Sequence, residues 1–180
     1  MQLIDFGLAT VLPKGKKAFT VCGTRYYFAP EMIKRKCGYT TSVDVWAFGL
    51  MVYEFYTGWT PFMSTQYKVE KRQMNQEILQ CEQDGTIPYE RTDADFPLKH
   101  PEAWALIKRC LVAPRSRMTP QECCRTGYFS SMDWSALNSK QVKVPFRPSM
   151  LEHRKNVAQK EAQKLSIPPY TGPVITFAGW

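Results

Sequence analysis

The sequence lacks several features that would assign it to a whole class of proteins. No run approaches the roughly 20 consecutive apolar residues of a membrane-spanning helix, and no charged-then-apolar N-terminal segment resembles a secretion signal. The six cysteines show no paired C-x-x-C spacing, which argues against a zinc site and, without a secretory context, against a disulfide framework. We therefore expect reduced thiols and a cytoplasmic location.

The composition is that of a globular protein with excess positive charge. The chain has 180 residues, 44% hydrophobic and 22% charged, which suits one domain or one domain with a tail. A net charge of +8 is compatible with binding to nucleic acid or acidic membranes, but the basic residues occur in short scattered groups without interleaved aromatic residues. A solvated basic surface is the favoured interpretation, so we expect no nucleic-acid partner.

The most apolar segment is residues 41–58. From its second turn to its last, only Gly49 and Glu54 interrupt a run of apolar and aromatic side chains. No polar stripe remains, which predicts a helix that is buried on most sides. Ser42 is expected to cap its start and Gly58 to end it in the left-handed conformation.

The other elements are predicted from local signals. They predict a short β segment at residues 2–4 and loops at 11–21 and 88–97. Helices are expected at 64–84 and 101–112, and a short helix starts at the capping box Thr119–Glu122. The tail is expected to be partly extended, with a weakly anchored polar helix at 152–165. Of Cys123 and Cys124 on the short helix, one is expected to pack rather than react. The predicted fold is mainly α.

Several short motifs occur in a fixed order. They are Asp5-Phe6-Gly7, Cys22-Gly23-Thr24, Ala29-Pro30-Glu31, Asp44-x-Trp46-x-x-Gly49 on the apolar helix, Tyr128-Phe129, Asp133-Trp134 and Phe177-x-x-Trp180. This set resembles the C-terminal lobe of protein kinases, and within them the AGC serine/threonine kinases such as protein kinases A and G. The resemblance implies a kinase-like C-lobe over residues 1–129 and an AGC C-terminal tail over residues 130–180.

The resemblance also implies an activity and a set of functional residues. The complete enzyme would use ATP and Mg²⁺ to phosphorylate Ser or Thr of protein substrates. Asp5 would bind the metal ion. Thr20 would be the activation-loop phosphosite, modified by an upstream activating kinase. Thr24 and Glu54 would contact substrate, with Glu54 recognising a substrate arginine.

Other residues would have structural roles. Phe6 and Gly7 complete the Asp-Phe-Gly turn, and Asp44 would hold the backbone of the catalytic loop. Glu31 is expected to form a buried ion pair with Arg117. The aromatic pair Phe177 and Trp180 would be the hydrophobic motif that docks on the N-terminal lobe.

Each role has a plainer alternative. Asp5 is also a common residue for a turn before glycine, Thr20 an ordinary loop hydroxyl, Glu54 one half of a structural ion pair, and the tail a disordered end. The family pattern Thr-Pro-Glu is replaced by Thr24-Arg25-Tyr26, which weakens the expectation of a basic substrate. Ala113 similarly stands where the family usually has aspartate.

The 180 residues contain no Gly-rich loop, no strand lysine and no His-Arg-Asp catalytic loop. In the family these parts precede Asp-Phe-Gly, so the chain is expected to be the second half of a kinase and inactive by itself. The alternative is a non-catalytic binding or decoy module derived from a kinase. Regulatory domains or subunits would be partners outside this sequence.

Overall fold

The computed structural model describes residues 5–34, 36–62, 71–88 and 95–142. Regular structure in these ranges is helical, apart from one isolated antiparallel bridge between Ala18 and Tyr39. The expectation of a mainly α fold is therefore confirmed. The β segment predicted at residues 2–4 and the tail after residue 142 lie outside the described residues. The chain divides into two compact units, Met1–Met132 and Asp133–Trp180.

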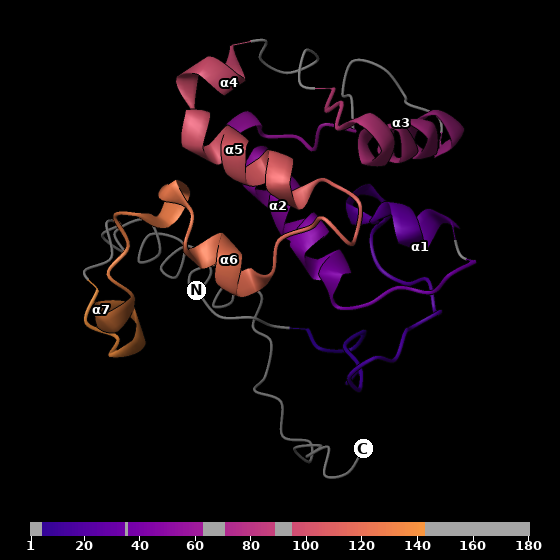
Figure 1. The fold of residues 1–180 in the computed structure, drawn as a ribbon, viewed down its shortest axis with the longest axis horizontal. Helices are drawn as coiled ribbons and strands as arrows, with labels where there is room; N and C mark the ends of the chain where they lie inside the picture. Colours follow the sequence, from indigo (N-terminus) through magenta and orange to yellow (C-terminus); the bar gives the residue numbers. More distant parts are fainter. Residues whose placement is uncertain (1–4, 35, 63–70, 89–94, 143–180) are drawn as a thin grey trace, which may run out of the picture. The chain divides into compact units, whose positions relative to one another are not determined.

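Figure 1 shows the helices in chain order. The first unit contains η1 (Arg25–Tyr27), α1 (Pro30–Lys34), α2 (Ser42–Thr57), α3 (Lys71–Asp84), α4 (Phe96–Lys99), α5 (Pro101–Cys110), α6 (Pro120–Cys124) and η3 (Gly127–Phe129), and the second unit contains α7 (Trp134–Asn138). None of the helices in the described ranges is both long and apolar enough to cross a membrane.

Helix α2 is the centre of the first unit, and α5 packs along it (Figure 1). Trp46, Leu50 and Tyr53 of α2 are completely buried. Gly49 lies at the closest approach, since a Cβ atom there would be 2.5 Å from the Cβ of Cys110 on α5. The glycine in this apolar run is thus required by the packing of the two helices.

The C-terminal end of α2 is as predicted, and its N-terminal end is not. Gly58 ends the helix with φ +80°, and its N–H donates to the carbonyl of Glu54 at 2.7 Å, as predicted. The prediction that Ser42 caps the start is wrong. Ser42 is already the first helical residue, so its hydroxyl is not in the capping position, and its N–H lies 3.4 Å from the hydroxyl of Thr40.

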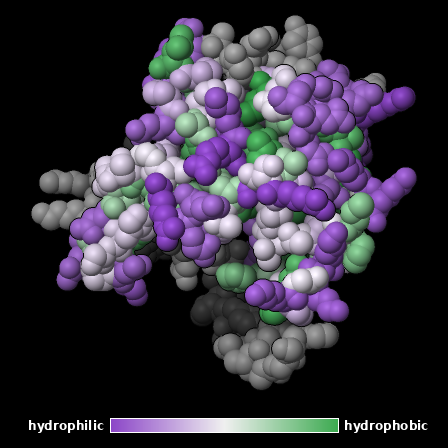
Figure 2. Space-filling view, in the orientation of Figure 1, coloured by the Kyte–Doolittle hydropathy of each residue, from purple (hydrophilic) through white to green (hydrophobic). Residues whose placement is uncertain are grey.

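Burial along α2 is less complete than the sequence predicts. Phe55, in the last turn, is 69% exposed, and Trp59 beyond the helix is 40% exposed. A shallow, mostly apolar groove of about 360 Å³ opens along the same helix, lined by Tyr27, Asp44, Ala47, Phe48 and Met51. Elsewhere, the face drawn in Figure 2 is largely hydrophilic. The prediction of burial therefore holds for the face of α2 that includes Trp46, Leu50 and Tyr53, and fails along the groove and at the last turn.

The helices predicted at 101–112 and from Thr119 are present, as is the described part of the one predicted at 64–84, whereas the short helices η1, α1, α4, η3 and α7 were not predicted. The capping box that starts α6 is complete, and Cys123 packs in the core while Cys124 is exposed, as expected. Helix α3 ends before Gly85, which has φ +75°. Within the predicted loop at residues 88–97, a single helical turn, α4, begins at Phe96. The ring of Phe96 packs against the rings of Tyr53 and Trp104, with ring centroids 5.4 and 5.9 Å apart. These tertiary contacts could not be predicted from the local sequence.

Candidate functional site

The Asp5-Phe6-Gly7 segment forms a tight, exposed turn. Asp5 has φ 62°, a left-handed conformation that few residues other than glycine adopt, although Asp tolerates it. The N–H of Gly7 lies 3.3 Å from Oδ1 of Asp5, and the N–H of Ala9 donates to the carbonyl of Phe6 at 3.0 Å. The side chain of Phe6 is 67% exposed. The turn therefore presents the Asp5 carboxylate to solvent.

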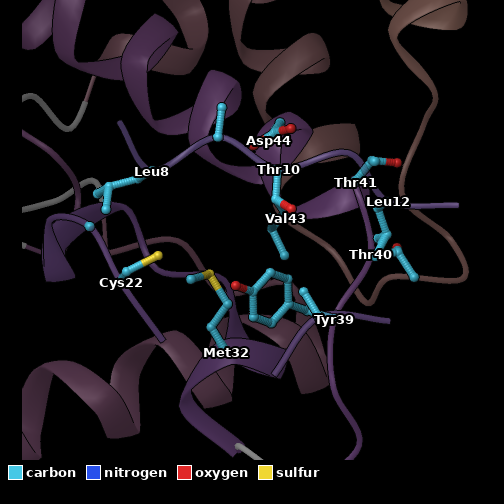
Figure 3. A pocket seen from close by; sticks show the side chains of 13 residues that line it. Leu8, Thr10, Leu12, Cys22, Met32, Tyr39, Thr40, Thr41, Val43 and Asp44 are labelled. Carbon is cyan, nitrogen blue, oxygen red and sulfur yellow. The ribbon is translucent and has the colours of Figure 1, made fainter. Parts of the chain in front are cut away.

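A pocket of about 310 Å³ lies between the residues that follow this turn, from Leu8 to Leu12, and the start of α2. In the close view of Figure 3, the sulfur-containing side chains of Cys22 and Met32 and the ring of Tyr39 lie on one side of the pocket, while Asp44 lies at another. Asp44 is in the first turn of α2, where the helix dipole favours a negative charge. Its side chain is exposed.

The candidate phosphosite Thr20 is exposed on a segment held by backbone pairing. Ala18 and Tyr39 exchange two backbone hydrogen bonds of 2.9 Å each, and the hydroxyl of Tyr39 donates to the carbonyl of Thr20. The ammonium group of Lys17 donates to the carbonyl of Cys37 at 2.8 Å. These contacts fix the backbone around Thr20 and leave its hydroxyl accessible. They join segments about 20 positions apart, and no local signal in the sequence predicted them.

Glu31 and Arg117 are brought together in the core. The guanidinium donates two hydrogen bonds to the carboxylate, Nη1 to Oε1 at 2.7 Å and Nη2 to Oε2 at 3.1 Å. It donates three more, to the carbonyl of Ser42 and twice to that of Val112, at 2.9 to 3.1 Å. It also lies over the ring of Trp46, 5.2 Å from the centroid. All five donors of Arg117 are satisfied, and one side chain ties α1, α2 and the loop after α5 together.

Glu54 is half-buried and has a partner that the sequence did not reveal. The hydroxyl of Tyr27 donates to Oε2 of Glu54 at 2.6 Å. This hydrogen bond to the carboxylate, followed by burial and the nearby negative charge, raises the pKa of Tyr27 above its ordinary value. The pairing joins η1, just before the Ala-Pro-Glu segment, to the last turns of α2. It explains how the carboxylate of Glu54 is accommodated within the apolar part of α2.

Thr24 and Arg25 complete the loop that leads to Glu31. Thr24 is exposed and precedes η1 without a side-chain cap bond. Nη1 of Arg25 lies 3.4 Å from Oδ1 of Asn75 on α3, and its guanidinium carbon lies 6.0 Å from the centroid of the Phe28 ring. The arginine that departs from the family pattern is therefore held in one position by α3 and by its own loop.

The predicted residues thus fall into three groups. Residues of the first group are engaged with named partners: Glu31, Arg117 and Glu54. Those of the second are exposed on the loop surface or at the start of α2: Asp5, Phe6, Gly7, Thr20, Thr24 and Asp44. The third group, Phe177 and Trp180, lies outside the described residues. Tyr27, Tyr39 and Arg25 are residues of this site whose contacts the sequence did not predict.

Comparison with known proteins gives consistent matches. Residues 1–129 match the family described as the protein kinase domain. The chain is 31% identical over 157 residues to ribosomal protein S6 kinase alpha-4 of Mus musculus, an alignment that covers 82% of this chain and 19% of the mouse protein. It is 34% identical over 154 residues to serine/threonine-protein kinase sck2 of Schizosaccharomyces pombe, covering 82% and 22%. With SCH9 of Saccharomyces cerevisiae, identity is 30% over 156 residues, covering 84% and 17%. The chain spans about a fifth of the length of these relatives.

Proposed function

The chain belongs to the protein kinase family, in its AGC group, and from this premise we propose that it forms part of a serine/threonine protein kinase. In this proposal residues 1–129 contribute the C-terminal lobe of the catalytic domain and residues 130–180 the AGC tail. The proposal rests chiefly on the way the segment from Asp5 to Glu31 is anchored to the rest of the first unit. Its two ends bear the Asp-Phe-Gly and Ala-Pro-Glu motifs, and Tyr27 and Glu31 anchor it to α2 and to Arg117.

Asp5 is the residue proposed to bind Mg²⁺. In phosphoryl-transfer sites Mg²⁺ is held by one or two carboxylates together with substrate phosphates, and it neutralises the charge on those phosphates. Asp5 fits this donor set, because its carboxylate is exposed and one oxygen receives only the 3.3 Å contact from Gly7. Among the described residues no three His, Cys, Asp or Glu side chains form a metal site by themselves, so a single carboxylate shared with a nucleotide is the arrangement that the residues favour.

The other proposed roles concern binding and positioning. Thr24 and Glu54 contact a protein substrate, and Asp44 supports a catalytic loop from the start of α2. Thr20 is the site of phosphorylation by an upstream kinase, where a phosphate adds about −1.5 to −2 charges and can pair with nearby basic groups. Phe177 and Trp180 form the docking motif of the tail. Protein substrates, the upstream kinase and a regulatory domain or subunit are the proposed partners, and the cytoplasm is the proposed location.

The catalytic base and the nucleotide cradle are the parts that this proposal assigns to residues outside the 180. The sequence contains no His-Arg-Asp loop and no Gly-rich phosphate loop. A separate candidate function, a binding or decoy module, is supported by the groove along α2 and the exposed rings of Phe55 and Trp59.

Transfer of labelled phosphate from ATP to a serine- and threonine-containing protein tests the proposal. The 180-residue chain and the longest native polypeptide that contains it are assayed side by side. We expect transfer by the longer polypeptide and none by the 180-residue chain. Activity of the 180-residue chain, after removal of contaminating kinases, would contradict the assignment of the base to other residues. Absence of both transfer and nucleotide binding in the longer polypeptide would favour the binding module.

A further inference from the structure

Arg25 carries a positive charge that forms no ion pair with an acidic group of the described residues. The half-buried side chain is held by the amide oxygen of Asn75 at 3.4 Å and by the ring of Phe28 at 6.0 Å, neither of which bears a net charge. Among the described residues no carboxylate lies within ion-pair distance of it. Within the described ranges, Asn75 occupies one of the five N–H donors of Arg25 and the other donors are unused, so a fixed guanidinium with free donors remains beside α3.

The residues next to Arg25 in the chain carry no negative charge. Glu54 belongs to the same site, where its Oε2 atom accepts the 2.6 Å hydrogen bond from Tyr27, and among the described residues it forms no ion pair with Arg25. Tyr26, which follows Arg25, is neutral and 44% exposed. Residues 24–27 therefore present one net charge, and it is positive. A substrate arginine would meet a like charge here, whereas a carboxylate or phosphate would meet a complementary one.

The position of Arg25 relates this charge to the substrate. Arg25 directly follows Thr24, the residue proposed to lie near the phosphate-accepting hydroxyl. Consecutive Cα atoms are about 3.8 Å apart, and an extended peptide advances about 3.3 Å per residue. The backbone of Arg25 therefore lies next to the proposed acceptor position, where its side chain can reach substrate residues within about two positions of the accepting Ser or Thr.

We propose that Arg25 makes the site select protein substrates that carry an acidic or phosphorylated residue within two positions of the accepting Ser or Thr. A guanidinium binds a carboxylate or phosphate through two parallel hydrogen bonds, which an ammonium group does not reproduce. Asn75 and Phe28 restrict the guanidinium before substrate arrives, which lowers the entropy lost on binding. The inference rests on the proposed kinase function and adds the substrate class to it.

Fluorescence anisotropy of labelled peptides bound to the 180-residue chain tests the inference. Each peptide has a central serine in a neutral background, with Asp, phosphoserine, Gln or Arg at one position within two residues of it. We expect the Asp and phosphoserine peptides to bind about five- to tenfold more tightly than the Gln peptide, and the Arg peptide more weakly. The difference should shrink as salt is raised, because the Debye length is about 8 Å at physiological ionic strength.

Two variants separate this role from a structural one. Arg25→Gln should abolish the preference, while Arg115→Gln, which removes the same charge from an exposed loop residue, should retain it. If Arg25 only anchors the loop to α3, Arg25→Gln will lower the melting temperature and leave the ratio of peptide affinities unchanged, which would overturn the inference. Equal binding of all peptides would contradict the inference alone. Binding of none of them would contradict the proposed substrate site together with it.

Discussion

Replacing Arg117 by alanine tests the buried contact that holds the first unit together. The substitution removes five hydrogen bonds and leaves the carboxylate of Glu31 buried, because Glu31 is only 8% exposed. Breaking a buried ion pair by deleting one partner typically costs about 3–5 kcal/mol. The carbonyls of Val112 and Ser42 also lose their donor, so we expect the cost to lie in the upper part of that range.

The magnitude converts into a readily measured shift. In a chain of this size each 1 kcal/mol lowers the melting temperature by about 2–4 °C, so Arg117→Ala should lower it by about 6–20 °C. Circular dichroism during thermal unfolding gives the melting temperature, and urea denaturation gives the free energy of unfolding.

Matched variants show whether the loss comes from the pairing. Arg115→Ala changes an exposed arginine two residues earlier and should shift the melting temperature by no more than about 2 °C. The double variant Glu31→Ala/Arg117→Ala should be more stable than the sum of the single effects predicts, because no unpaired charge remains. A melting temperature of Arg117→Ala equal to that of the wild type would refute the reasoning.

Two further predictions concern local stability. Thr119→Ala should lower the free energy of unfolding, measured by urea denaturation, by about 1 kcal/mol, because it removes the hydroxyl that accepts a hydrogen bond from the N–H of Glu122. Thr119→Ser keeps a hydroxyl and should change the free energy of unfolding by only a few tenths of a kcal/mol. Equal losses in both variants would contradict the capping role. Burial, and after it a hydrogen bond with Tyr56, raises the pKa of Tyr128 to about 12. The neutral hydroxyl therefore stabilises the folded state fully below the unfolded pKa of about 10, and this stabilisation is lost as the pH rises toward 12. Tyr128→Phe should therefore reduce the fall in melting temperature between about pH 10 and 12, and an identical pH profile in both proteins would count against this cause.

The sequence predicted those features that have local signals. The apolar run and Gly58 predicted α2, Pro101 and the helical spacing of apolar residues predicted α5, and the pattern Thr119-Pro120-Gln121-Glu122 predicted α6. The pairing of Glu31 with Arg117, 86 positions apart, came from the family resemblance, because no local pattern connects two such residues.

The features that were missed depend on tertiary contacts. The hydrogen bond from Tyr27 to Glu54, the pairing of Ala18 with Tyr39 and the contact of Arg25 with Asn75 each join residues at least 20 positions apart. A helical period shows which side chains are apolar but not whether another segment covers them. For this reason the exposure of Phe55 in the last turn of α2 was not predicted.

The rate of phosphate transfer in an Asp5→Asn variant tests the proposed kinase function most directly. It is measured on the longest native polypeptide that contains the 180 residues, with Asp84→Asn as the control because Asp84 is an exposed aspartate of α3. A metal ligand is worth several kcal/mol in the transition state, so Asp5→Asn should lower kcat by about 100-fold or more, while the control stays within about twofold. Equal rates in the wild type and in Asp5→Asn would contradict the assignment of Asp5 and the function built on it.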